Sequence, residues 1–92
     1  MAISDFSHKG LHELFVHGKS AKIRPDMKKN VLRILDALDA ISRPEDLQGF
    51  KDFHALVGSR KGTYSLHVNR NYCITFLWNG EDATDVNLED YH

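Results

Sequence analysis

Apolar residues recur at spacings of three and four in the first half of the chain, and at every second position in much of the second half. The first spacing is typical of amphipathic helices. It predicts a short helix with Ser7 as its N-cap and Gly18 as its stop signal. A longer helix is predicted to begin near Pro25, a residue that suits the first helical turn. The core-facing residues of the longer helix are expected to be Met27, Val31, Ile34, Leu35, Leu38 and Ile41.

Two shorter elements are predicted outside these helices. Residues 2–4 favour a short extended piece before the first helix. Residues 42–45, with Pro44 among them, resemble a capping box and predict one further turn that ends near Gly49. The helical half of the chain is therefore expected to end just before Phe50.

The alternating half predicts antiparallel strands. The expected strands are residues 53–57, 63–68, 72–78 and 83–91, and the expected turns are residues 58–62, 69–71 and 79–80. Ser65 and His67 alternate with apolar residues, so their face of the sheet is expected to meet water or ligand. Helices followed by a strand meander predict a single α+β domain over residues 1–92, with N-terminal helices packed on a small antiparallel C-terminal sheet.

Composition limits the setting of this domain. A chain of 92 residues supports one modest core, because it buries only about 60–65% of the unfolded surface. Cys73 is the single cysteine, no stretch approaches the length of a membrane span, and the first residues lack the order of a signal peptide. These features predict a cytoplasmic protein that does not associate with membranes.

The net charge of −1 conceals an uneven distribution. Residues 19–33 are rich in lysine and arginine and contain one acid, Asp26, whereas residues 79–92 contain acids but no lysine or arginine. The basic stretch is therefore suited to contact phosphates and the acidic stretch is not. The alternative is that both clusters are ordinary solvated surface.

The end of the chain holds the best candidates for chemistry. Asp90, Tyr91 and His92 place an acid, a phenol and an imidazole in a row, and His54 lies near the start of the strand-rich half. RNA can cleave itself when a base takes the 2′-hydroxyl proton, donors neutralise the phosphorane, and an acid protonates the departing 5′-oxygen. We expect the tail to fold back beside His54. Strand alternation gives Asp90 and His92 one parity and Tyr91 the other, so convergence of all three depends on the geometry.

Residues in the predicted turns are candidates for binding RNA. Arg60, Lys61 and Arg70 are placed to hold phosphate, and Tyr72 is the best candidate for stacking on a base, although its parity also suits the core. A metal site is not predicted, because the pair His8 and His12 supplies only half of a zinc site. No cofactor is predicted either.

Three stretches of this chain resemble the HigB toxins, the plasmid-maintenance killer branch of the RelE-like group. They are Lys9-Gly-Leu-His-Glu-Leu-Phe15, residues 54–76 from His54-Ala-Leu-Val-Gly to Asn71-Tyr-Cys-Ile-Thr-Phe76, and Asn87-Leu-Glu-Asp-Tyr-His92. The resemblance covers nearly the whole chain. It implies a compact RelE-like toxin that enters the A site of the 70S ribosome and cuts translated mRNA without metal. It also implies a HigA-type helix-turn-helix antitoxin, with operator DNA bound only by the toxin–antitoxin complex.

The resemblance also implies roles for particular residues. The working histidine of the family falls on His54, and its terminal acid, tyrosine and histidine fall on Asp90, Tyr91 and His92. The basic stretch would then hold ribosomal RNA. The residues expected to do so are Lys22, Arg24, Lys28 and Lys29.

This chain departs from the family pattern at two positions. Cys73 stands where relatives usually have an arginine thought to stabilise phosphate charge, and Val57 stands where a lysine is common. Three explanations stay open: a neighbour such as Arg70 substitutes, the protein is naturally weak, or Cys73 attenuates a lethal activity. The departures also support an alternative function, a module that binds antitoxin or ribosome and cleaves nothing. Direct DNA binding by the basic helix is a weaker alternative, because the net charge is small.

Overall fold

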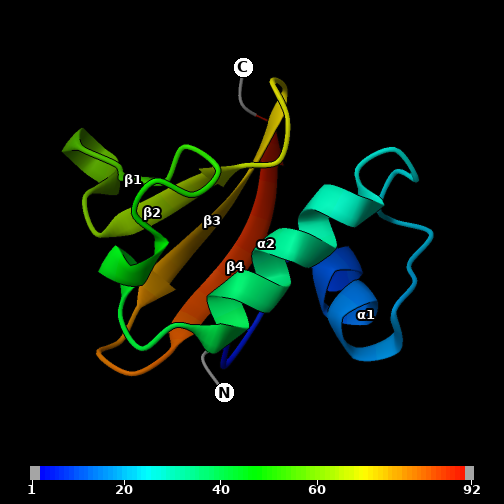
Figure 1. Ribbon diagram of the computed structural model, residues 1–92, viewed down its shortest axis with the longest axis horizontal. Helices are drawn as coiled ribbons and strands as arrows, with labels where there is room; N and C mark the ends of the chain where they lie inside the picture. The colour runs from blue at the N-terminus through cyan, green and yellow to red at the C-terminus, as the bar shows by residue number, and fades with distance from the viewer. Residues whose placement is uncertain (1–2, 91–92) are drawn as a thin grey trace.

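The computed structural model describes residues 3–90 and contains two α-helices, two short 3-10 helices and one sheet. The elements are α1 (Lys9–His17), α2 (Lys28–Ala40), η1 (Pro44–Leu47), β1 (His54–Ala55), η2 (Gly58–Arg60), β2 (Thr63–His67), β3 (Tyr72–Trp78) and β4 (Ala83–Asp90). The sheet has the order β1-β2-β3-β4, with every neighbouring pair antiparallel (Figure 1). The predicted α+β architecture, with helices first and a meander after, is confirmed.

Helix α1 begins one residue later than the sequence predicts. Its N-cap is His8, whose Nδ1 accepts a hydrogen bond from the backbone N–H of Leu11 at 3.2 Å. Burial, and then the charge of Lys22, lowers the pKa of His8, so its ring stays neutral and can accept this bond. The hydroxyl of Ser7, the predicted cap, instead donates to the carboxylate of Asp85 on β4 at 3.3 Å.

The predicted end of α1 is confirmed, whereas the start of α2 is three residues later than expected. Gly18 closes α1 with a φ of +79°, a conformation that favours glycine. Pro25 lies in a turn in which the N–H of Met27 bonds to the carbonyl of Arg24, and regular helix begins only at Lys28. The predicted capping box is also shifted. The carboxylate of Asp46, rather than that of residue 45, accepts hydrogen bonds from the backbone N–H groups of Ser42 and Arg43 at the start of η1.

Two strands differ from their predicted form. Strand β1 has only two residues, because the chain turns into η2 at Gly58, where φ is +71°. Strand β4 contains a bulge at Asp85, with φ of +51°, where the pairing register with β3 shifts. The extra residue allows both Ala83 and Val86 to lie in the core.

The N-terminal segment covers the outer edge of β4. Ile3 and Phe6 form parallel bridges to Ala83 and Val86, and the N–H of Ser4 bonds to the carbonyl of Ala83 at 2.9 Å. The predicted extended piece therefore exists and reaches further along the chain than expected. It leaves fewer unpaired backbone groups on that edge of the sheet.

One face of the sheet packs against α1 and α2 and holds the core (Figure 1). Phe76 is the largest fully buried side chain. Its ring stacks on that of Tyr64, with the ring centroids 5.4 Å apart. The opposite face was expected to meet water or ligand. On that face Ser65 and Thr75 are 1% and 3% exposed, so it is a partly covered polar surface.

Candidate functional site

The sheet register gathers polar side chains on the face opposite the core. His54 pairs with Ser65, Ser65 with Thr75, His67 with Cys73, and Cys73 with Glu89. Directly opposite residues on neighbouring strands project from the same face of a sheet. We call the following set the polar face: His54, Ser65, His67, Cys73, Thr75 and Glu89.

The half-buried ring of His54 is fixed in one tautomer by its backbone neighbour. Its Nδ1 lies 2.9 Å from the carbonyl oxygen of Asp52. A carbonyl can only accept, so Nδ1 carries the proton and the neutral ring has its lone pair on Nε2. This is the form that a general base requires.

His67 lies beside His54, and Asp52 contacts both rings. The ring centroids of His54 and His67 are 6.2 Å apart in an edge arrangement, and Nε2 of His67 lies 3.6 Å from Oδ2 of Asp52. The backbone of Lys51 and Asp52 adopts φ values of +48° and +56°, which are uncommon for residues other than glycine. Neither His67 nor Asp52 was predicted from the sequence as a site residue. The alternation of His67 with apolar neighbours was the available signal.

Arg60 and Glu89 form a short bidentate ion pair across the polar face. Nη1 and Nη2 of Arg60 lie 2.7 Å from Oε1 and Oε2 of Glu89, and the Thr75 hydroxyl donates to Oε2 at 2.6 Å. The hydrogen bond from Arg60 is the main cause that lowers the pKa of Glu89, and the same bond raises the pKa of Arg60. Both groups are therefore charged at neutral pH. Glu89 was also missed as a site residue.

Cys73 lies directly opposite Glu89 and is only 5% exposed. Burial is the main cause that raises the pKa of its thiol. At neutral pH the side chain is therefore an uncharged thiol, which cannot stabilise a phosphate charge as an arginine would.

Of the other predicted RNA-binding residues, Lys61 and Arg70 lie in turns beside the sheet, and Tyr72 has the parity of the core face. Lys61 is exposed just after η2, and Arg70 is exposed in the turn between β2 and β3. Tyr72 is half-buried and packs against the core. The side-chain oxygen of Asn69 accepts the backbone N–H groups of Asn71 and Tyr72 and so holds this turn in place.

The described residues do not bring Asp90 together with His54. Asp90 pairs with Tyr72, whose side chain contacts the core, so the register assigns Asp90 to the face opposite the polar face. The two residues also lie on the outermost strands, roughly 14 Å apart by the usual strand spacing. Tyr91 and His92 lie outside the described residues. Within residues 3–90, the register places Glu89 of β4 on the same face as His54.

The basic stretch divides into paired and unpaired cations. Lys22 contacts Glu13 at 3.2 Å, and Arg24 makes two 3.2 Å contacts with Asp26. Lys28 and Lys29 are exposed at the start of α2, and neither has an ion-pair partner within 4.0 Å among residues 3–90. Of the residues predicted to hold ribosomal RNA, these two carry uncompensated charge.

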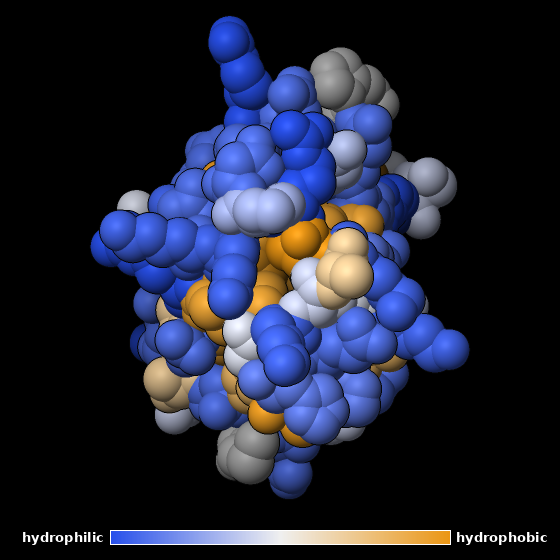
Figure 2. Space-filling model, turned by 90° about the vertical axis from the view of Figure 1, so that its right-hand side faces the viewer, coloured by the Kyte–Doolittle hydropathy of each residue, from blue (hydrophilic) through white to orange (hydrophobic). Residues whose placement is uncertain are grey.

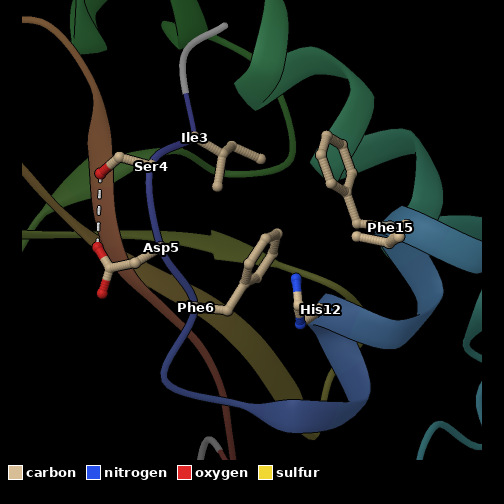
Figure 3. Close-up of a pocket in the computed structure, with 7 residues that line it drawn as sticks. Ile3, Ser4, Asp5, Phe6, His12 and Phe15 are labelled. Atoms are coloured by element: carbon tan, nitrogen blue, oxygen red, sulfur yellow. Dashed lines mark hydrogen bonds between the residues drawn. The ribbon is translucent and has the colours of Figure 1, made fainter.

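A separate hollow lies between the N-terminal segment and α1. Phe6 and Phe15 point toward one another with ring centroids 5.6 Å apart, and the ring of His12 lies 5.4 Å from Phe6 (Figure 3). Val16, which also lines the hollow, is 56% exposed. The side of the molecule nearest α1 shows an apolar area surrounded by hydrophilic residues (Figure 2). The hollow offers contact area rather than groups arranged for proton transfer.

Residues 3–90 contain neither a candidate metal site nor a candidate membrane-spanning helix. No group of three or more His, Cys, Asp or Glu side chains there is arranged to hold a metal ion. No helix in the same part of the chain has the length and apolar character needed to cross a membrane.

Residues 4–92 match a family model described as the RelE-like toxin of type II toxin–antitoxin system HigB. The chain is 38% identical over 95 residues to the protein named Endoribonuclease HigB from Proteus vulgaris, covering 98% of this chain and 99% of that protein. It is 30% identical over 90 residues to Toxin HigB-1 from Vibrio cholerae serotype O1, covering 95% of each. A solved structure of the YoeB dimer from Staphylococcus aureus is similar with a TM-score of 0.62 and 18% identity, covering 100% of this chain and 99% of that one. That likeness concerns the fold alone.

Proposed function

Because this chain belongs to the HigB family of RelE-like toxins of type II toxin–antitoxin systems, we propose that it is an endoribonuclease that cuts mRNA in the A site of translating ribosomes. The observation that carries the proposal is the tautomer of His54, whose Nδ1 bond to the Asp52 carbonyl leaves Nε2 as a base on the polar face. The likeness to Endoribonuclease HigB supports the same reaction.

The reaction is attack of a 2′-hydroxyl on the adjacent phosphorus, with cleavage of the bond to the 5′-oxygen. His54 Nε2 takes the proton from the 2′-hydroxyl, and an acid from the tail returns a proton to the 5′-oxygen. His92 is the proton-transfer candidate of the tail, and Tyr91 positions the substrate. Asp90 lies on the opposite face from His54 and is not assigned to this step. Neither metal nor cofactor takes part.

Cations around the polar face bind the RNA. Arg60 reaches the face itself, and Lys61 and Arg70 lie in the flanking turns, where they contact neighbouring phosphates. Tyr72 provides the aromatic surface for stacking at the start of β3.

A type II toxin implies an antitoxin partner. We propose that this partner is a HigA-type helix-turn-helix protein and that operator DNA is bound only by the complex. The substrate is mRNA on ribosomes, so the protein acts in the cytoplasm.

The test is incubation of the purified protein with 70S ribosomes programmed with a defined mRNA, followed by mapping of the 5′ ends. We expect cuts within codons in the A site, no cuts in free mRNA, and loss of the cuts with His92→Ala. Intact message on ribosomes that still bind the wild-type protein would instead support the second candidate, a binding module, which Cys73 and Val57 favour.

Reversal of charge at Lys28 and Lys29 is expected to weaken ribosome association and to flatten its dependence on salt. Each uncompensated cation that contacts RNA releases condensed counterions, which sets the salt slope. The measurement is the association constant of Lys28→Glu/Lys29→Glu across a series of salt concentrations. The same reversal at Lys22 and Arg24 is expected to have a smaller effect, because local acids already neutralise both. A salt slope equal to that of the wild type in the Lys28/Lys29 variant would contradict this role.

A further inference from the structure

The ion pair between Arg60 and Glu89 joins two distant parts of the chain. Arg60 ends η2 and Glu89 lies near the end of β4, yet both terminal nitrogens of the guanidinium lie 2.7 Å from the two carboxylate oxygens. The hydroxyl of Thr75, which is 3% exposed, fixes the same carboxylate from β3. Glu89 is thus held from two directions and in turn holds η2 against the sheet.

This pair differs from the other ion pairs of the described residues. Those have nitrogen–oxygen distances of 3.2 to 3.6 Å, and none has both a bidentate contact and a third bond from a buried hydroxyl. Arg24 and Asp26, for comparison, are separated by a single residue, and both are more than 60% exposed. Bidentate geometry with partial burial is the arrangement in which an arginine–carboxylate pair fixes orientation.

The pair also has a particular position. Glu89 directly opposes Cys73, the site at which the HigB resemblance leads one to expect an arginine. Arg60 therefore brings a guanidinium to the polar face next to a position where the resemblance predicts one and Cys73 stands. Arg70, the other arginine considered as a substitute, lies in the exposed turn between β2 and β3.

We propose that Glu89 is a positioning residue, which holds Arg60 on the polar face so that Arg60 is the phosphate-binding cation in place of an arginine at position 73. This role rests on the proposed nuclease function. A guanidinium has five N–H donors, of which Glu89 takes two. The remaining three, including that on Nε, are left to contact a scissile phosphate.

The test is the cleavage rate of Glu89→Gln on programmed ribosomes, measured as kcat and KM. Glutamine preserves the size of the side chain but offers one acceptor oxygen and no charge, so Arg60 loses its bidentate anchor. Misplacement of a positioned group by about 1 Å can cost roughly 10²-fold in rate, and we expect kcat to fall about 10- to 100-fold. Ribosome affinity, which a merely local change should leave alone, is expected to stay within about twofold.

A double-mutant cycle separates positioning from general loss of stability. In an Arg60→Ala background, Glu89→Gln is expected to cause no further loss, because the group that Glu89 positions is absent. Asp46→Asn is the matched control: Asp46 also pairs with an arginine and accepts backbone N–H groups, but it does so on η1. It is expected to keep the wild-type kcat. Should Glu89→Gln fail to fold, Thr75→Val removes one bond to the carboxylate and is expected to lower kcat to a smaller extent.

The outcomes are distinct. Wild-type protein that cuts no mRNA overturns the nuclease function and this role with it. Wild-type protein that cuts, with Glu89→Gln equally fast or faster, overturns this role alone. This role is also overturned if Glu89→Gln lowers kcat by the same factor in the wild type and in the Arg60→Ala background.

Discussion

Replacement of His54 by alanine is expected to lower the rate of mRNA cleavage on programmed ribosomes by about 10²- to 10⁴-fold, the usual contribution of a positioned general base. The reason is the anchored tautomer, because the bond from Nδ1 to the Asp52 carbonyl presents Nε2 as the ring's proton acceptor. Alanine removes this acceptor. The ring of His67 is 24% exposed and lies beside Asp52, so it does not occupy the position of the missing His54 ring. Single-turnover cleavage of A-site mRNA measures the effect.

His17→Ala is the matched control for this experiment. His17 is exposed at the end of α1, so its removal should leave the polar face intact and the cleavage rate unchanged. Both variants should retain the wild-type unfolding temperature and ribosome affinity within error. A His54→Ala variant that folds, binds ribosomes and cuts at the wild-type rate would show that the base is another group.

Periodicity predicted the elements of this fold better than it predicted their ends. Strand β3 covers residues 72–78 as expected, since every second residue faces a continuous core. The predicted N-cap of α1 was wrong because the hydroxyl of Ser7 donates its hydrogen bond to Asp85. This partner lies 78 residues away, and no local sequence signal specifies it. Strand β1 was predicted too long for a related reason: its pairing ends where the left-handed Gly58 turns the chain into η2.

Some members of the candidate site could be predicted from the sequence, but the contacts that join them could not. His54 and Arg60 were predicted as candidates from the chemistry of their side chains. The alternation of side chains along a strand correctly predicted that Glu89 and Asp90 lie on opposite faces of the sheet. The pairing of Arg60 with Glu89 depends on how η2 folds over the sheet, which period-two alternation does not encode. Burial of Thr75 follows from the same contact, because its hydroxyl is satisfied by a carboxylate rather than by water.

Introduction of an arginine at position 73 is expected to raise cleavage, and cell toxicity with it, by up to about 10²- to 10³-fold, the scale of one preorganised donor at a charged transition state. Cys73 opposes Glu89, whose charge is now balanced by Arg60 alone. A second guanidinium would leave the group with a net positive charge, which favours a phosphate that gains negative charge in the transition state. The carboxylate directly opposite also offsets the cost of placing a charge where the thiol is 5% exposed.

Three substitutions at this position test the argument together by their cleavage rates on programmed ribosomes. Cys73→Ser keeps a small neutral side chain and should leave the rate unchanged, whereas Cys73→Lys adds a charge without the planar fork and should give a smaller gain than Cys73→Arg. The gain should depend on charge at the polar face, so it should diminish as salt screens the interaction. A Cys73→Arg protein that folds and binds ribosomes but cuts no faster than the wild type would mean that Arg60 already supplies all the phosphate stabilisation this site can use.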